Sequence, residues 1–221
     1  MIKGVICDVD GTIVDSNDQH ANAWQEAFRE FGIILPWDKI RAQIGKGPDQ
    51  LIPEFLTPEQ ISRFGDQVEK KKDRIYKKKY LDQIKGLPGV YPFFKKLHEE
   101  KKTIVLATSG GANEIRYYTR LLGVEKWVRD IVSADDVARS KPYPDIFHIV
   151  LDRFQLKPSE AIVIGDTPYD VFAAKKLGLA TLALLTGGFS DQSLREAGAS
   201  EVYRDLSELL ERYADSRLGS G

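Results

Sequence analysis

Short apolar runs rich in valine and isoleucine alternate with longer stretches of helical periodicity through most of the chain. Such alternation is typical of βαβ units, in which helices connect the strands of a parallel sheet. The predicted strands are residues 3–8, 103–108, 130–133, 161–165, 180–185 and 201–203. The predicted helices that connect or follow them are residues 112–122, 143–155, 168–178, 190–198 and 205–214. The fold class is therefore predicted to be α/β, with a doubly wound parallel, Rossmann-like sheet as its core.

A long region without strand-like alternation separates the first predicted strand from the second. Pro36 and Pro58 stand where helices of this region would begin, and Gly32 stands where one would end. The helices predicted here are residues 17–31, 36–44, 48–55 and 58–82. The predicted organisation is an α/β core of residues 1–15 and 85–216, an inserted helical subdomain of residues 16–84, and a flexible tail of residues 217–221.

Composition and charge place the chain among soluble globular proteins and limit the classes of partner that we expect. Hydrophobic residues make up 42% and charged residues 29% of the 221 residues, which is ordinary for such proteins. A net charge of -1 provides no overall field that would attract nucleic acid or an anionic membrane. The lysines of the helix predicted at 58–82 are interpreted as a solvated face. We therefore expect no nucleic-acid or membrane partner, while the oligomeric state stays open.

The N-terminal apolar run and the cysteine content indicate the cellular compartment that we expect for this protein. The run meets Asp8 too early for a signal peptide or a membrane span, so a cytoplasmic location is expected. Cys7 is the only cysteine, which excludes an intramolecular disulfide, and its place in the apolar run predicts a small buried side chain. One cysteine and three histidines give little support to a zinc site.

Two carboxylates one residue apart, Asp8 and Asp10, end the first predicted strand. Two unit negative charges about 4 Å apart repel by roughly 4 kcal/mol at an effective dielectric constant of 20. A half-buried strand end is therefore an unfavourable place for both carboxylates unless a positive charge compensates. A bound cation is the simplest such charge.

Polar side chains also follow the later strands, at the edge where ligands bind in a parallel α/β sheet. Thr108 and Ser109 follow the second strand, and Lys141 lies in the loop after the third. Asp166 follows the fourth strand, with Asp170 close behind. Each residue alone has a simple structural explanation, such as a turn, a helix cap or a surface charge. Their arrival at one sheet edge, in this order, is much harder to explain by chance.

These groups suit phosphoryl transfer. Asp8, Asp10 and Asp166 provide hard oxygen ligands of the kind that Mg²⁺ prefers. The hydroxyl of Thr108 and the ammonium of Lys141 suit a phosphoryl group. The backbone N–H groups expected to hold phosphoryl oxygens belong to Gly11, Thr12 and Ser109.

The two N-terminal carboxylates can divide the work of such a reaction. A carboxylate beside Mg²⁺ and a phosphate can act as a nucleophile and form an aspartyl-phosphate, which water later hydrolyses. A second carboxyl two residues on can protonate the leaving oxygen and later deprotonate that water. Asp8 and Asp10 are therefore expected to have different roles.

Four ordered segments resemble the motifs of the haloacid-dehalogenase-like superfamily. They are DVDGT at 8–12, the strand end at Thr108-Ser109, SKPYPD at 140–145 and GDTPYD at 165–170. The resemblance covers nearly the whole chain, including the position of a helical cap after the first motif. It implies that residues 16–84 close over the site, exclude water and contact the substrate.

The resemblance also implies a role for each matching residue. Asp8 would be the nucleophile and a metal ligand, while Asp10 would be the general acid and base and offer its backbone carbonyl to the metal. Thr108 and Lys141 would bind the transferring phosphoryl group, and Lys141 would also hold Asp8. Asp166 would be the third protein ligand of Mg²⁺, and Asp170 would orient a water or the loop from behind the ligands.

Several positions separate the reactions found within the superfamily. Its dehalogenase members need no metal and lack an aspartate two residues after the nucleophile, so Asp10 favours a phosphate ester. HANAW at 20–24 resembles the first cap helix of β-phosphoglucomutase-like members, which would place His20 beside Asp10; a helix histidine with no special role is the alternative. Gly165 stands where the mutases usually carry an acidic residue, and IGKGPDQ at 44–50 stands where they tend to carry a Ser-Arg pair.

These departures favour a phosphatase similar to phosphoglycolate phosphatase and its relatives. The expected function is Mg²⁺-dependent hydrolysis of a small phosphorylated metabolite, phosphoglycolate-like or sugar-phosphate-like, through an aspartyl-phosphate. Lys46 is expected to contact the substrate, with Arg41 as a weaker candidate; a solvent-facing turn is the alternative for Lys46. A phosphomutase, a dehalogenase and a catalytically inactive binding module remain as alternative functions.

Overall fold

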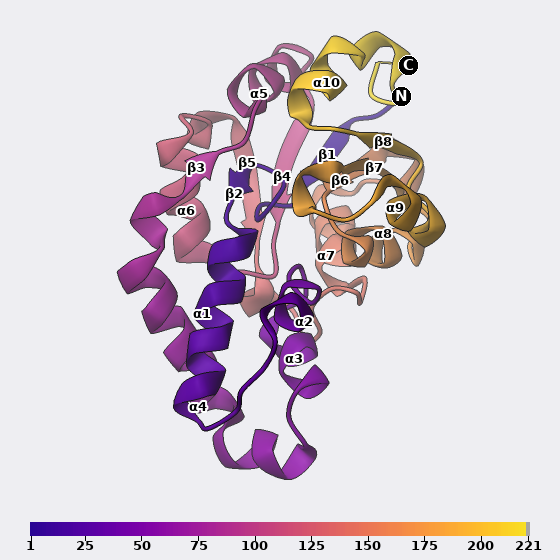
Figure 1. The fold of residues 1–221 in the computed structure, drawn as a ribbon. Helices are drawn as coiled ribbons and strands as arrows, with labels where there is room; N and C mark the ends of the chain where they lie inside the picture. Colours follow the sequence, from indigo (N-terminus) through magenta and orange to yellow (C-terminus); the bar gives the residue numbers. More distant parts are fainter. Residues whose placement is uncertain (220–221) are drawn as a thin grey trace.

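Six parallel strands form the central sheet in the computed structural model, which describes residues 1–219 (Figure 1). Their order across the sheet is β5-β4-β1-β6-β7-β8, so the first strand of the chain lies in the middle. The strands are β1 (Gly4–Cys7), β4 (Thr103–Ala107), β5 (Val128–Val132), β6 (Ala161–Gly165), β7 (Ala180–Leu184) and β8 (Glu201–Tyr203). The predicted α/β class with a doubly wound parallel sheet is confirmed.

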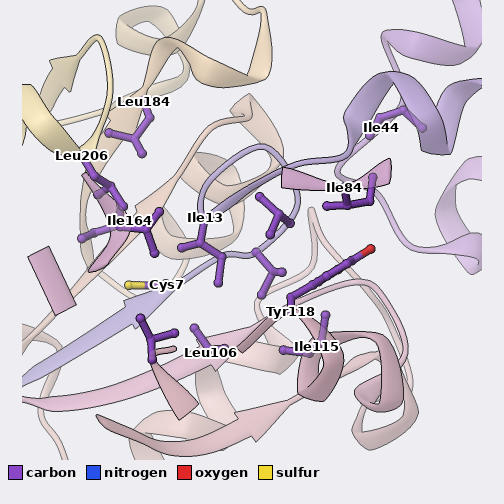
Figure 2. Close-up of a cluster of buried hydrophobic side chains, with 14 of the residues drawn as sticks. Cys7, Ile13, Ile44, Ile84, Leu106, Ile115, Tyr118, Ile164, Leu184 and Leu206 are labelled. Atoms are coloured by element: carbon purple, nitrogen blue, oxygen red, sulfur yellow. The ribbon is translucent and has the colours of Figure 1, made fainter. Parts of the chain in front are cut away.

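Both faces of the sheet are buried. On β1, Cys7 belongs to one buried cluster and Ile6 to another, because successive side chains of a strand point to opposite faces. Figure 2 shows part of the first cluster, in which Cys7 lies beside Leu106 and Ile164, its partners on the neighbouring strands. Cys7 is fully buried, as predicted, and burial raises the pKa of its thiol, so the side chain is an unreactive part of the core.

Within residues 1–219, six α-helices belong to this α/β core. They are α5 (Val90–Glu99), α6 (Ala112–Leu121), α7 (Asp145–Phe154), α8 (Pro168–Lys175), α9 (Asp191–Ala197) and α10 (Leu206–Glu211). Helix α5 is absent from the sequence prediction. Its signal is nevertheless present, because Val90, Phe93, Phe94 and Leu97 follow the i, i+3, i+4, i+7 spacing and are all buried. No helix within residues 1–219 combines the length and the apolar character needed to cross a membrane.

The inserted helices leave and rejoin the core through a short antiparallel ribbon. The insertion consists of α1 (Asn17–Glu30), α2 (Trp37–Arg41), α3 (Pro48–Leu51) and α4 (Pro58–Lys79). The ribbon pairs β2 (Val14–Asp15) with β3 (Lys85–Gly86) and was not predicted. The two ends of the insertion therefore lie side by side, while its helices project beyond one end of the sheet (Figure 1).

All four inserted helices end before the predicted residue, and α2 and α3 differ most from their predicted ranges. The helix predicted at 36–44 ends at Arg41, where the chain approaches Gly45, which has a φ of 108° that no α-helix contains. The helix predicted at 48–55 ends at Leu51 and continues as a 3₁₀ turn, Ile52–Glu54. Helix α4 begins as predicted, with Pro58 in its first turn after the cap.

The C-terminal segment returns to the core. Of the flexible tail predicted for 217–221, residues 217–219 form a turn, while residues 220–221 lie outside the described residues. Leu218 is buried against the first cluster. The chain is therefore anchored close to its C-terminus.

Candidate active site

The carboxyl ends of three neighbouring strands bring the site together. Strand β1 lies between β4 and β6. Asp8, Thr108 and Asp166 each come directly after the last residue of one of these strands. The path of the chain across the sheet reverses at β1, which is where ligands bind in sheets of this kind. The predicted convergence of these residues at one edge is thus present in the fold.

Asp8, Asp166 and Asp170 form a buried group, which we call the carboxylate triad. One oxygen of each lies within 4.8 Å of the others, and none of the three residues is more than 7% exposed. The hydroxyl of Thr12 lies 3.2 Å from Oδ2 of Asp8 and 3.0 Å from Oδ1 of Asp166, linking these two. Asp170 lies in the first turn of α8, where it accepts a hydrogen bond of 2.7 Å from the hydroxyl of the capping residue Thr167.

Lys141 supplies the only ammonium that contacts the triad within residues 1–219. Its Nζ lies 2.6 Å from Asp8 Oδ1, 2.7 Å from Asp170 Oδ1 and 2.8 Å from the carbonyl oxygen of Ala107. The contacts with Asp8 and Ala107 are hydrogen bonds, and the contact with Asp170 is an ion pair. Burial lowers the pKa of Lys141, but Asp170 and Asp8 outweigh this effect and raise it above its ordinary value. Lys141 is therefore a permanent cation held inside the site.

One ammonium does not offset three buried carboxylates. Burial raises the pKa of Asp8 well above its ordinary value, and the charges of Asp170 and Asp166 add to this. Lys141 opposes the shift of Asp8 without cancelling it. Burial, followed by the charge of Asp170, raises the pKa of Asp166 to about 7. The site is therefore short of positive charge at neutral pH.

The triad fits a hard divalent cation such as Mg²⁺, which prefers carboxylate oxygens. The side-chain oxygen of Asn17 is buried without a hydrogen-bond partner, while its Nδ2 donates to Asp166 at 2.9 Å. A cation, or a water bound to it, would satisfy this orphaned oxygen. Two of the predicted ligands, Asp8 and Asp166, are together in the triad, and Asp170 joins them more closely than the sequence predicts.

Gly11 and Gly187 enclose the carboxylate of Asp166. An added Cβ at these positions would lie 2.1 Å and 2.3 Å, respectively, from Oδ2 of Asp166. Gly11 also has a φ of 79°, in the region that favours glycine. The glycine of the DVDGT segment is therefore explained by the space that the carboxylate needs.

Asp10 has partners of its own. Its Oδ1 accepts a hydrogen bond from the hydroxyl of Ser16 (2.6 Å) and lies 3.0 Å from Nε2 of His20. Burial would raise the pKa of Asp10, but the charge and hydrogen bond of His20, with the hydrogen bond of Ser16, lower it to about 2. His20 is buried and stacks on Tyr76, with ring centroids 3.9 Å apart. Asp8 is therefore repelled more by the other two carboxylates of the triad than by Asp10, the partner that the sequence suggests.

The loop after β1 uses two of the N–H groups that the sequence assigns to phosphate. The N–H of Gly11 donates to the carbonyl of Val14 (2.8 Å), and that of Thr12 donates to the carbonyl of Val9 (3.1 Å). Gly11 and Thr12 thus shape the loop instead of presenting N–H groups to a ligand, which corrects that expectation. The N–H groups of Val9 and Asp10 make no hydrogen bond within residues 1–219 and are the available donors of this loop.

A cavity of about 280 Å³ lies over this edge of the sheet. The core residues Asp8, Asp10, Thr108 and Ser109 line it together with His20 from α1. Residues of α4 and of the loop between α2 and α3 also line it, so core and insertion face the same space. Its volume lies just below the roughly 300–1,000 Å³ that is common for small-molecule sites, which favours a small ligand.

The loop between α2 and α3 rests directly on the core. The hydroxyl of Tyr169 donates to the carbonyl of Ala42 (2.6 Å), and the hydroxyl of Ser109 donates to the carbonyl of Gly45 (3.2 Å). An added Cβ on Gly45 would lie 2.7 Å from the side chain of Thr167. The insertion is therefore closed over the site in this structure.

The two basic candidates of the insertion have different surroundings. Lys46 lines the cavity, but its ammonium pairs with Glu54 at 2.7 Å. Arg41 does not line the cavity; its Nε pairs with Asp18 at 2.7 Å, and its Nη2 donates to the carbonyl of Gly187 at 2.7 Å. Arg41 thus joins the insertion to the core, and Lys46 is the one of the two that lines the cavity.

Lys72 departs from the interpretation of the α4 lysines as a solvated face. Lys70 and Lys78 are exposed as expected, but Lys72 is only 8% exposed and lines the cavity. It lies four residues after Val68 and three before Ile75, both of which are buried. Helical neighbours at these spacings share a face. The spacing was therefore an available signal that this lysine points inward.

We expect the metal-free protein to melt at a higher temperature at pH 6 than at pH 8. The pKa of Asp166 is about 7 in the fold and near 3.8 in its absence, so the stabilisation due to its protonation is lost as the pH rises through 7. The expected difference is about 2 °C or more, the shift that roughly 1 kcal/mol causes in a chain of this size.

Thermal unfolding in EDTA at the two pH values measures this difference, and the Asp166→Asn variant should reduce it. Added Mg²⁺ should raise the melting temperature more at pH 8 than at pH 6, because it binds the ionised carboxylates. Equal melting temperatures in EDTA would contradict the assigned charge state.

Comparisons with known proteins place the chain in a family. The family model described as haloacid dehalogenase-like hydrolase matches residues 5–184. A phosphoglycolate phosphatase from Vibrio parahaemolyticus is 28% identical, over 97% of this chain and 97% of its own length. A phosphorylated carbohydrates phosphatase from Thermotoga maritima is 27% identical, over 95% of this chain and 100% of its own length.

A solved structure extends this likeness to the fold. A hydrolase from Pseudomonas syringae superposes with a TM-score of 0.89 and 30% sequence identity, covering 97% of this chain and 99% of that one. The family match spans the insertion and every member of the carboxylate triad. The chain therefore belongs to the haloacid dehalogenase-like hydrolases.

Proposed function

We propose that this chain is a Mg²⁺-dependent phosphatase that hydrolyses a small phosphorylated metabolite through an aspartyl-phosphate on Asp8. The observation that carries the proposal is the division of the carboxylates. Asp8 belongs to the charge-deficient triad and also lines the cavity, while Asp10 lines the same cavity with separate partners. The names of two relatives, a phosphoglycolate phosphatase and a phosphorylated carbohydrates phosphatase, support a phosphate ester as the substrate.

Asp8 acts as the nucleophile. Its raised pKa shows that the ionised form is disfavoured by its surroundings, so attack requires positive charge close by. Lys141 provides part of this charge at 2.6 Å. Asp8, Asp166 and Asp170 would hold Mg²⁺, with the carbonyl of Asp10 as a further ligand. When bound, the cation neutralises charge on the carboxylates and on the transferring phosphoryl group.

Asp10 moves protons at the leaving oxygen. It is ionised in the free site, and a phosphate dianion placed beside it raises its pKa, because a like charge disfavours the ionised form. With its pKa raised in this way, Asp10 takes up a proton from the solvent as the ester binds. It gives this proton to the leaving oxygen, and the resulting carboxylate then takes one from the water that attacks the aspartyl-phosphate. Ser16 and His20 fix the orientation of its carboxylate throughout.

The phosphoryl group is held from several sides. The cavity contains Thr108 and Ser109 at the end of β4. The unused N–H groups of Val9 and Asp10 provide donors in the first loop, and Lys141 adds a fixed positive charge. The insertion, with boundaries proposed at residues 16–84, acts as a cap that excludes bulk water during the reaction.

Gly165 favours hydrolysis over a mutase reaction. An added Cβ at this position would lie 2.5 Å from the carboxyl carbon of Asp170. The acidic residue usual in the mutases therefore does not fit here while Asp170 occupies its place in the triad. A requirement for a sugar bisphosphate in the assay would instead identify a phosphomutase.

The direct test is phosphate release from p-nitrophenyl phosphate, measured with Mg²⁺ and with EDTA. We expect turnover that depends on the metal and needs no bisphosphate. Chloride release from a chlorinated acid without metal would indicate a dehalogenase instead. Absence of hydrolysis for this and other phosphate esters would support a binding module.

The Asp10→Asn variant should slow hydrolysis by roughly 10²- to 10⁴-fold, the usual contribution of a general acid or base. The loss should be larger for an alkyl phosphate than for p-nitrophenyl phosphate, because the nitrophenolate leaves without a proton. Steady-state rates on both esters measure the difference. An equal loss on both would remove leaving-group protonation from the role of Asp10.

A further inference from the structure

The cavity contains a second polar pair that the proposed chemistry does not use. Lys72 from α4 and Glu114 from the first turn of α6 both line it. Their exposed fractions are 8% and 6%, so both charged side chains are nine-tenths buried. We call Lys72 and Glu114 the distal pair, because neither contacts the carboxylate triad within residues 1–219.

Most hydrogen-bond donors of the Lys72 ammonium are unused. Its only polar side-chain contact within residues 1–219 is a long one, 3.4 Å to Oδ1 of Asp73. Its ammonium otherwise lies 5.6 Å from the ring centre of Trp24 and 5.4 Å from that of Tyr76. An ammonium has three N–H donors, so most of its hydrogen-bonding capacity is free for a ligand in the cavity.

The hydrogen-bond acceptors of the Glu114 carboxylate are unused. Its carboxylate makes no hydrogen bond and no ion pair within residues 1–219, although the residue is buried and faces the cavity. Burial raises its pKa, and the nearby charge of Lys72 opposes this shift. Both carboxylate oxygens are therefore free to accept hydrogen bonds from a ligand in the cavity.

We propose that the distal pair recognises the alcohol part of the phosphate ester, and that this part is an uncharged polyhydroxylated group, as in a sugar or polyol phosphate. The inference rests on the proposed phosphatase function. A hydroxyl satisfies both members, because it can donate to Glu114 and accept from Lys72.

A carboxylate in the same position meets a mixed environment. Lys72 and the exposed Lys77 attract it, but Glu114 repels it, and three further acidic residues line the cavity, Glu69, Asp73 and Asp135. The other lysine from the insertion that is mostly buried here, Lys46, is already paired with Glu54. The surroundings therefore select against an ester whose alcohol part is an acid.

The apolar lining agrees with a carbohydrate. Trp24 and Ile44 line the cavity and are 4% exposed. Apolar walls with a few placed polar groups are typical of small-molecule sites, and a sugar offers both C–H surface and hydroxyls. A cavity of about 280 Å³ also restricts the substrate to small esters.

The test compares kcat/KM for hydroxyl-bearing and carboxylate-bearing esters, each divided by the value for p-nitrophenyl phosphate. Glucose-6-phosphate, ribose-5-phosphate and glycerol phosphate represent the first class, and phosphoglycolate represents the second. We expect the best hydroxyl-bearing ester to exceed phosphoglycolate by about 10-fold or more, since one well-placed hydrogen bond to a charged group has an effect of this size. A preference for phosphoglycolate would overturn the proposal.

Two variants assign the preference to the distal pair. Glu114→Gln keeps the shape and removes the charge, so it should lower the relative kcat/KM for the hydroxyl-bearing ester by about 10-fold and raise that for phosphoglycolate. Lys72→Met should lower both relative values. The exposed Lys78→Met and Glu125→Gln variants are matched controls and should change neither. An equal fall for every ester in Glu114→Gln would show a structural role and refute recognition.

A binding measurement separates this proposal from the proposed function. Calorimetric titration of the Asp8→Asn variant measures affinity without turnover, and the hydroxyl-bearing esters should bind more tightly than phosphoglycolate. If p-nitrophenyl phosphate is not hydrolysed by the unaltered protein, the proposed function fails. If it is hydrolysed but phosphoglycolate binds more tightly, only the role of the distal pair fails.

Discussion

The Asp8→Asn variant is expected to lose Mg²⁺-dependent hydrolysis of p-nitrophenyl phosphate almost completely. The asparagine amide is not a nucleophile, and loss of the nucleophile in a covalent hydrolase costs about 10⁶-fold in kcat. The fold should be retained, because asparagine has nearly the same volume as aspartate. The surroundings of Asp8 disfavour its ionised form, as its raised pKa shows. The melting temperature in EDTA should therefore be unchanged or higher.

Two measurements decide this prediction. Phosphate release detects any residual turnover, and mass spectrometry after quenching detects phosphate on the unaltered protein but not on the variant. Asp166→Asn is the matched comparison, because it removes a carboxylate from the same triad without removing the nucleophile. Turnover by Asp8→Asn at more than about a thousandth of the original rate would exclude an aspartyl-phosphate on Asp8.

The Lys141→Met variant is expected to show the largest loss of stability. Methionine keeps most of the volume, but it leaves the triad buried without a cation. Breaking a buried ion pair from one side costs about 3–5 kcal/mol, which corresponds to a fall of roughly 10 °C in the melting temperature at pH 8. Hydrolysis should fall as well, because Lys141 holds Asp8 and supports its ionised form.

The deficit of Lys141→Met should depend on pH and on metal. Without the ammonium, the pKa values of the triad rise further, so protonation at low pH relieves the repulsion and stability is lost as the pH rises. The variant should therefore be closest to the original protein near pH 5, and Mg²⁺ should recover part of the loss at pH 8. Lys78→Met, an exposed lysine, is the control. A deficit that is independent of both pH and Mg²⁺ would indicate a packing effect only.

The sheet and its functional edge could be predicted because the signals are local. Each strand is a short apolar run that ends in a polar residue, and parallel strands align their carboxyl ends. Asp8, Thr108 and Asp166 therefore converge without any knowledge of the loops. The ribbon of β2 and β3 could not be predicted, since two-residue strands carry no periodicity and depend on pairing across the whole insertion.

The contacts within the site were less accessible to prediction. Only one residue separates Asp8 from Asp10, which suggests that they repel each other, whereas their side chains have different partners. The direction of a side chain beyond a strand end depends on loop geometry, here on hydrogen bonds that engage the N–H groups of Gly11 and Thr12. Ser16 matters because it folds back onto Asp10, and no pattern in the sequence reports such a contact.

The ribbon at the base of the insertion has a consequence for how this protein can change. Val14 pairs with Gly86 and Asp15 with Lys85, so the ends of the inserted segment are fixed next to each other whatever lies between them. The entropy of closing a loop between fixed ends grows only slowly with its length, by about 0.6 kcal/mol for each doubling. The helices can therefore be lengthened, shortened or exchanged at little cost to the sheet. Substrate preference can evolve in one module while the other preserves the reaction.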